Sequence, residues 1–119
     1  MKKTARKDDY LLLLTTTNRI EEAHRMADHL VAAGLVACVN IIPSIFSIYL
    51  WKGAVQKDNE VLMILKTKKS KIGKLQETFR KIHGYETPEL IACRLEYGLP
   101  EYLRWIDDSL AGRKSNPKS

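Results

Sequence analysis

The chain of 119 residues contains few of the features that build covalent frameworks or membrane spans. It has two cysteines, Cys38 and Cys93, which are too few for a disulfide framework and do not indicate an oxidising compartment. No apolar run approaches the roughly 18 residues that a membrane-spanning helix requires. The basic N-terminal sequence MKKTARKDD is not followed by the hydrophobic segment of a signal peptide. We therefore predict a cytoplasmic protein without a membrane partner.

The positive charge of the chain is concentrated at its two ends. The formal net charge is +6, but residues 1–9 carry four basic and two acidic side chains, and residues 112–119 carry three basic and no acidic ones. Because these ends contain little apolar surface to bury, we predict disordered tails over 1–9 and 112–119 and a single domain over 10–111. The domain is nearly neutral and has no aromatic residues interleaved with its basic ones, so we expect no nucleic-acid partner.

The order of apolar patterns along the chain predicts an α+β fold. Strand patterns cover Tyr10–Thr17, Leu35–Trp51, Val61–Thr67 and Pro88–Tyr97, and helix patterns begin near Ile20, Ser70 and Pro100. We read Lys52–Glu60 as a turn region, Ser70 as the N-cap of the second helix, and Pro43-Ser44 as a bend or bulge, because proline has no N–H to donate. The order β-α-β-β-α-β-α predicts a ferredoxin-like βαββαβ sandwich, with a four-stranded antiparallel sheet and an extra C-terminal helix.

Both faces of the long strand pattern at Leu35–Trp51 are largely hydrophobic. A two-layer sandwich covers only one face of its sheet, so the other face of this strand would meet water. A bare apolar face on the order of several hundred Å² usually marks an interface. We therefore predict that the protein associates with itself through its sheets.

Several motifs together resemble those of the CutA divalent-cation tolerance family. They are LVACVNIIPSIFSIYLWKG at 35–53, EVLMILKT at 60–67 and HGYETPELIA at 83–92. The resemblance covers about Tyr10 to Leu110 and implies a homotrimer, similar in architecture to PII signalling proteins, that is linked to tolerance of copper and other divalent metals. Two positions depart from the usual family pattern, because Ser44 stands in place of a glycine and Gly84 in place of a proline.

The matched motifs contain three candidate metal ligands. Imidazole and thiolate suit copper, so we predict a metal site formed by His83 and Cys38, with Glu89 as a carboxylate ligand. Two alternatives remain open: His83 could simply satisfy carbonyls at a helix end, and Cys38 could be a small buried hydrophobic residue, as we read Cys93. One histidine and one cysteine are fewer ligands than a structural zinc site uses, so we expect that copper or another divalent cation is not required for folding.

The same motifs also predict a ligand cleft between subunits. Polar groups that converge with aromatic residues are typical of small-molecule sites, and the candidates here are Asn40, Tyr49, Trp51, Glu60, Lys66 and Tyr85. The alternative for the aromatic residues is packing inside the trimer, and the alternative for Lys66 is a stem buried along apolar surface with its charge in water.

Two function classes follow from these site predictions. The first is a homotrimeric protein of metal-ion tolerance that binds copper or another divalent metal. The second is a PII-like regulatory module that binds a small anionic ligand at the intersubunit cleft. The sequence contains no nucleophile elbow, P-loop or HExxH motif, so we predict that the protein is not an enzyme.

Overall fold

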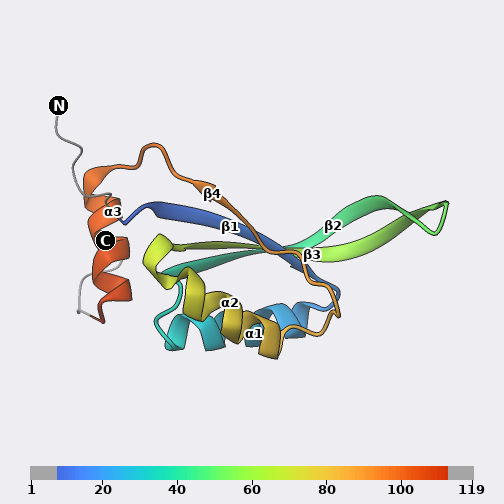
Figure 1. Cartoon of the computed structure of the whole chain (residues 1–119), viewed down its shortest axis with the longest axis horizontal. Coiled ribbons are helices and arrows are strands. Elements are labelled where there is room, and N and C mark those ends of the chain that lie inside the picture. The colour runs from blue at the N-terminus through green and yellow to red at the C-terminus, as the bar shows by residue number, and fades with distance from the viewer. Residues whose placement is uncertain (1–7, 113–119) are drawn as a thin grey trace.

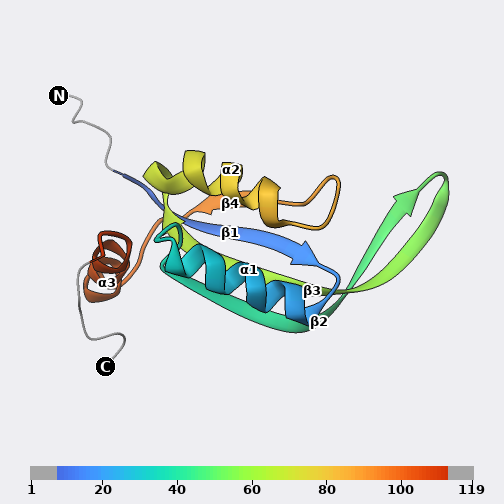
Figure 2. The same ribbon diagram turned by 90° about the horizontal axis from the view of Figure 1, so that it is seen from below.

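Four antiparallel strands form one sheet, and helices pack around it (Figures 1 and 2). The computed structural model describes residues 8–112. In chain order the elements are β1 (Tyr10–Thr17), α1 (Ile20–Ala32), β2 (Cys38–Trp51), β3 (Ala54–Lys68), the short 3-10 helix η1 (Lys69–Lys71), α2 (Ile72–Ile82), β4 (Ile91–Arg94) and α3 (Pro100–Leu110). The strand order is β2-β3-β1-β4, which confirms the predicted α+β sandwich with its extra C-terminal helix. Of the predicted tails over 1–9 and 112–119, residues 1–7 and 113–119 lie outside the described residues. Within 8–112, no helix is long and apolar enough to span a membrane.

The core lies between one face of the sheet and the helices α1 and α2. Burial alternates along β3, where Val61, Met63 and Leu65 point into the core and their neighbours are only half-buried. Burying one such side chain stabilises the fold by about 1.5–3 kcal/mol. The main cluster consists of Leu11, Leu13, Ala23, Met26, Ala27, Leu30, Leu35, Val36, Val61, Met63, Leu65 and Leu75.

The hairpin of β2 and β3 is longer than predicted. The turn region expected at Lys52–Glu60 is wrong, because Lys52 and Gly53 alone make the turn and Trp51 already pairs with Ala54. Both turn residues have positive φ, 50° and 79°, which is the backbone that a two-residue hairpin turn requires. The register shift between Ile42 and Ile45 confirms the bulge predicted at Pro43-Ser44. As a result, the hairpin projects well beyond the helices (Figures 1 and 2).

Two other boundaries differ from the sequence prediction. The last strand, expected over Pro88–Tyr97, is confined to Ile91–Arg94, where it pairs with Leu11–Leu14 of β1 before the chain turns away to α3. Ser70 does not cap α2, which begins at Ile72 after η1. Instead, the backbone N–H of Ser70 donates to Oδ1 of Asp8 at 2.8 Å, and its hydroxyl donates to Oδ2. Asp8, which lies inside the predicted N-terminal tail, therefore contacts the folded domain.

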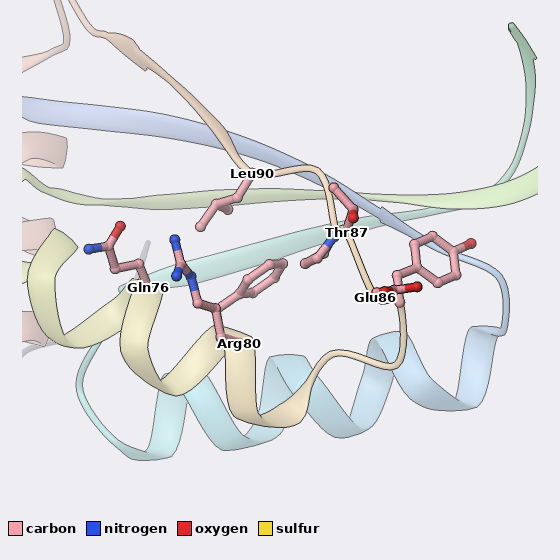
Figure 3. Close-up of a pocket in the computed structure, with 8 residues that line it drawn as sticks. Gln76, Arg80, Glu86, Thr87 and Leu90 are labelled. Atoms are coloured by element: carbon pink, nitrogen blue, oxygen red, sulfur yellow. The ribbon is translucent and has the colours of Figure 1, made fainter. Parts of the chain in front are cut away.

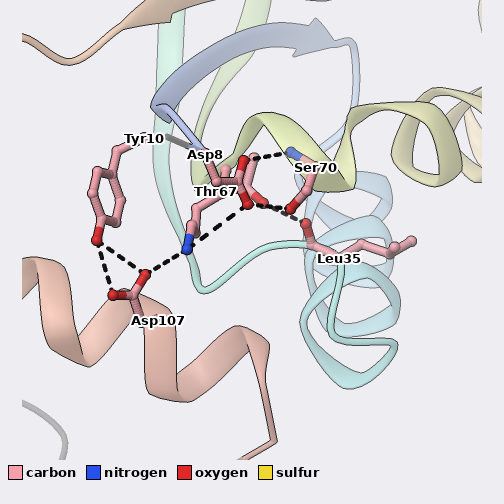
Figure 4. Close-up of polar contacts among 7 residues, drawn as sticks. Asp8, Tyr10, Leu35, Thr67, Ser70 and Asp107 are labelled. Atoms are coloured by element: carbon pink, nitrogen blue, oxygen red, sulfur yellow. Dashed lines mark hydrogen bonds and ion pairs between the residues drawn. The ribbon is translucent and has the colours of Figure 1, made fainter. Parts of the chain in front are cut away.

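The helix α3 is held at the end of the sheet opposite the hairpin by a polar network around Asp107 (Figures 1 and 4). The Tyr10 hydroxyl donates to Asp107 Oδ2 at 2.9 Å, and Lys68 Nζ lies 2.7 Å from Asp107 Oδ1. Ile106 and Leu110 of α3 are buried beside this network in a second apolar cluster. Tyr10 is the first residue of β1 and Lys68 is the last residue of β3, and the two residues pair in the sheet. The Asp107 carboxylate therefore joins α3 to this edge of both strands.

Tyr10 makes the docking of α3 sensitive to high pH. Burial, together with the hydrogen bond to Asp107 and its negative charge, raises the pKa of Tyr10 to about 12. A tyrosine in an unfolded chain titrates near pH 10, so this stabilisation is complete below about pH 10 and is lost as the pH rises through about 12. We expect the difference in unfolding free energy between wild type and Tyr10→Phe to shrink over that interval. Urea denaturation at a series of pH values measures it, and a difference that stays constant from pH 9 to 12 would contradict the assignment.

Candidate functional site

A polar cleft lies where the hairpin leaves the sheet. Its volume is about 620 Å³, and it is lined by Asn18, Tyr49, Asp58, Asn59, Glu60 and Tyr85. Four of these residues come from the hairpin, because pairing of β2 with β3 brings the aromatic residue of one strand to the acidic segment of the other. The other two come from the turn after β1 and from the loop after α2. Three segments distant in the sequence therefore meet at one site.

Two tyrosine–carboxylate pairs organise this cleft. The Tyr85 hydroxyl donates to Glu60 Oε2 at 2.7 Å, and the Tyr49 hydroxyl donates to the Asp58 carboxylate. Burial and the hydrogen bond to Glu60 raise the pKa of Tyr85, and the hydrogen bond to Asp58 raises the pKa of Tyr49. Both hydroxyls therefore remain protonated donors at neutral pH. Neither Asp58 nor Glu60 forms an ion pair with any residue in 8–112, so the cleft holds two uncompensated carboxylates.

The loop that carries Tyr85 is positioned by a buried histidine. The His83 side chain is only 8% exposed, and its ring packs against those of Phe79 and Tyr85 at centroid distances of 5.0 and 4.8 Å. Its Nε2 donates to the carbonyl oxygen of Thr16 at 2.8 Å, and its Nδ1 accepts the backbone N–H of Tyr85 at 2.9 Å. In this arrangement both ring nitrogens of His83 are hydrogen-bonded, so neither is free to coordinate a metal.

The start of the same loop is also tied to α1. Arg25 Nη2 donates to the carbonyl oxygen of Ile82, the last residue of α2, at 2.9 Å. Glu22, which accepts the Thr17 hydroxyl at 2.7 Å, lies so close to Gly84 that a Cβ there would be 2.8 Å from its Oε2. A Cβ at this position would thus require the flexible carboxylate end of Glu22 to shift.

The predicted metal ligands are not brought together within one chain. Cys38 lies opposite Lys66 in the sheet, whereas Thr16, which His83 contacts, lies opposite Leu62. Lys66 and Leu62 are four residues apart on β3, which corresponds to about 13 Å along the sheet, so Cys38 lies far from the carbonyl that His83 contacts. Glu89 is exposed in the loop before β4. Within residues 8–112, no group of three or more His, Cys, Asp or Glu residues is arranged to hold a metal ion, so a closed metal site does not fit a single subunit.

The predicted cleft is formed only in part. Tyr49, Glu60 and Tyr85 lie together as expected. Asn40 is exposed on β2, opposite Ile64. The remaining two residues lie elsewhere. Trp51 is at the tip of the hairpin, with Lys52 Nζ 5.7 Å from its ring centroid, and Lys66 Nζ lies 3.4 Å from the Tyr102 hydroxyl of α3. Without Lys66, the cleft lacks the positive charge that an anionic ligand would need.

Sequence reasoning missed three residues of this cleft, Asn18, Asp58 and Asn59. Asp58 and Asn59 were assigned to the turn region because these residue types favour turns. The sequence signal for a strand at these positions is Lys52-Gly53, because a glycine at the second position favours a two-residue hairpin turn, after which β3 begins at once. Counting outward from that turn puts Tyr49 on β2 close to Asp58 on β3.

The projecting hairpin carries a concentration of exposed apolar side chains next to the cleft. They are exposed by 59% to 77% and comprise Phe46, Ile48, Leu50, Trp51 and Val55. Isolated apolar residues on a surface are ordinary, but a contiguous group on one projecting element marks an interaction surface. We call these five residues the apolar hairpin surface.

Comparison with known proteins agrees with this geometry. The family model of the CutA1 divalent ion tolerance protein matches residues 11–109. This chain belongs to that family. Among its relatives, the CutA homolog of Xenopus laevis is 48% identical over 86 residues, which are 72% of this chain and 57% of the relative. The divalent-cation tolerance protein CutA of Thermus thermophilus is 39% identical over 98 residues, covering 82% of this chain and 95% of the relative.

Solved CutA structures share the fold over most of the chain. The crystal structure of CutA1 from Oryza sativa superimposes with a TM-score of 0.83 at 35% identity, covering 92% of this chain and 97% of the other. The CutA structure from Archaeoglobus fulgidus gives a TM-score of 0.81 at 36% identity, covering 85% and 98%. The chain spans about half the length of the vertebrate and plant relatives that it matches, whereas it covers nearly all of the Thermus protein.

The position of His83 predicts a structural rather than a ligand role. Replacing it with alanine removes two buried hydrogen bonds and leaves the Thr16 carbonyl and the Tyr85 N–H without their partner. We expect His83→Ala to lower the free energy of unfolding by about 1–3 kcal/mol, as measured by denaturant titration. His24→Ala, at an exposed position of α1, should change it by less than about 0.5 kcal/mol. Equal effects of the two substitutions would contradict this role.

Proposed function

We propose that this CutA protein acts in divalent-cation tolerance as a homotrimer that binds divalent cations at the polar cleft. The observation that carries the proposal is the pair of uncompensated carboxylates, Asp58 and Glu60, beside the apolar hairpin surface. The carboxylates supply negative charge for a cation. In the proposed homotrimer, a second subunit buries the apolar hairpin surface at the edge of the cleft.

The charge of the cleft favours a cation over an anion. Each carboxylate accepts one tyrosine hydroxyl, which orients it without neutralising it. Lys66, which would have balanced an anionic ligand, is engaged with Tyr102 at the other end of the sheet. The regulatory alternative with an anionic ligand in this cleft therefore has less support than the cation-binding function.

The available donors are oxygens rather than sulfur or nitrogen. Asp58, Asn59 and Glu60 present carboxylate and amide groups, which suit hard divalent cations. Copper(II) nevertheless binds most nitrogen and oxygen sites more tightly than other divalent first-row metals do, following the Irving–Williams order. We therefore propose that the cleft accepts several divalent cations and that copper(II) binds most tightly among the first-row metals.

The trimer completes this site in the proposal. Among residues 8–112, too few ligands converge for a closed metal site, and Tyr49, Asp58 and Asn59 belong to the same hairpin that carries the apolar hairpin surface. Covering that surface brings another subunit next to the cleft, where its side chains and ordered water fill the remaining coordination positions. Binding of this kind is modest in affinity and is not required for folding.

The proposed activity is binding rather than catalysis. The tyrosine hydroxyls of the cleft have raised pKa values and are hydrogen-bonded donors, which makes them poor bases at neutral pH.

We also propose a cytoplasmic location, because Cys38 and Cys93 are free thiols and a reducing compartment keeps them so. Fractionation of cells that express the full-length protein tests this location.

Removing the charge of the cleft should weaken cation binding. We expect the double substitution Asp58→Asn with Glu60→Gln to reduce copper(II) affinity at least about tenfold, while its amide oxygens still accept the tyrosine hydroxyls. Calorimetric titration of untagged, EDTA-treated protein with copper(II), and in parallel with calcium, measures the effect. Glu101→Gln, on the exposed face of α3, and Cys38→Ala serve as controls and should bind as wild type does. Unchanged affinity in the double variant would refute binding at the cleft.

A charge on the apolar hairpin surface should break the assembly. In the proposed trimer Ile48 is covered, and burying an unpaired charge costs several kcal/mol. We expect wild type to have about three times the 13.6 kDa chain mass in light scattering after size exclusion, and Ile48→Asp to elute as a smaller species. His24→Asp, on the exposed side of α1, should retain the wild-type mass. A trimer in both variants would show that the interface lies elsewhere.

A further inference from the structure

A second cavity lies on the other side of the loop that carries Tyr85 (Figure 3). It has a volume of about 410 Å³ and lies between the C-terminal half of α2 and the segment returning to β4. Its lining residues are Gln76, Phe79, Arg80, Tyr85, Glu86, Thr87, Pro88 and Leu90. No part of the proposed cation-binding function uses this cavity.

The base of the cavity is apolar, whereas Gln76, Arg80, Glu86 and Thr87 contribute polar side chains to its walls. Phe79 is buried at its base, and Pro88 and Leu90 are half-buried beside it. Tyr85 also borders the cavity, but its hydroxyl is directed to Glu60 in the polar cleft. The ring of Tyr85 therefore separates the two sites and presents its aromatic surface to this cavity.

One end of the cavity carries polar groups without partners. Gln76 and Arg80 are four residues apart on α2, so they lie on the same side of the helix, and both border this cavity (Figure 3). Neither side chain forms a hydrogen bond or ion pair with another residue in 8–112. Glu86 lies at the other end of the cavity, beside Tyr85 (Figure 3). The cavity is thus positive at one end and negative at the other, with an apolar centre.

We infer that this cavity binds a small monocarboxylate with an aromatic or branched apolar body. The planar guanidinium of Arg80 matches a carboxylate in shape and charge, and the Gln76 amide adds a further donor. The apolar body lies against Phe79, Pro88 and Leu90. The negative charge of Glu86 at the opposite end sets the orientation, because it repels the carboxylate toward Arg80. The volume is within the range of about 300–1,000 Å³ that small-molecule sites occupy.

Benzoate, benzamide and benzylamine test the inference, because they share one apolar body and differ in charge. We expect calorimetry on the EDTA-treated full-length protein to show one benzoate per chain, bound at least about tenfold more tightly than benzamide, with benzylamine weaker still. Arg80→Gln should abolish the preference for benzoate over benzamide. Lys81→Gln removes a charge from the next, exposed position of α2 and should leave the preference intact.

Three results would overturn the inference. The first is the absence of saturable benzoate binding to wild type, and the second is an equal loss of affinity in Arg80→Gln and Lys81→Gln. The third is benzoate binding only to the dissociated Ile48→Asp variant, which would show that a partner subunit fills the cavity in the assembly. Copper(II) titration of Arg80→Gln separates this inference from the proposed function, because cation binding at the polar cleft should be unaffected by that substitution.

Discussion

The position of the loop after α2 depends on one buried side chain. His83 bridges the Thr16 carbonyl at the end of β1 and the backbone N–H of Tyr85 in the loop, so it joins the sheet to a segment with no regular structure. Since each His83 nitrogen has a single partner, the ring holds one tautomer and one orientation. This fixes Tyr85, whose hydroxyl completes the polar cleft while its ring closes one side of the second cavity. Both candidate sites therefore depend on a histidine that lines neither of them.

The hairpin imposes the second constraint on the molecule. Its two-residue turn at Lys52-Gly53 keeps the segment from Ile45 to Trp51 paired with the segment from Ala54 to Glu60, which carries both strands beyond the layer of helices. Residues on this extension have no core of their own subunit to enter, so apolar side chains such as Phe46 and Leu50 remain exposed. The same extension presents Asp58 and Glu60 at its base. The polar cleft and the apolar hairpin surface therefore lie on one element, and the proposed function uses both, the first for cation binding and the second for assembly.

Much of the architecture could be predicted from local patterns. Which face of an element meets the core can be read from the spacing of apolar residues. That spacing has a period of two along Tyr10–Thr17 and Val61–Thr67 and is helical from Ile72 to Ile82. The errors fell where local and long-range signals compete. Asp58 and Asn59 favour turns on their own, but pairing with β2 extends the strand through them. Serine is a common helix cap, but the Ser70 hydroxyl donates a hydrogen bond to the carboxylate of Asp8, which is distant in the sequence.

The order of the elements, the bulge at Pro43-Ser44 and the membership of the CutA family could all be predicted from local patterns, because these depend on residue types at short spacing. The sequence also identified Glu60 and Tyr85 as neighbours in a cleft. The contacts that His83, Cys38 and Lys66 make could not be predicted in this way. A histidine in a loop can bind a metal or a carbonyl, and the choice depends on whether an acceptor such as the Thr16 carbonyl lies within about 3 Å of its ring. That distance is set by the packing of α2 and the loop against β1, which no local pattern encodes.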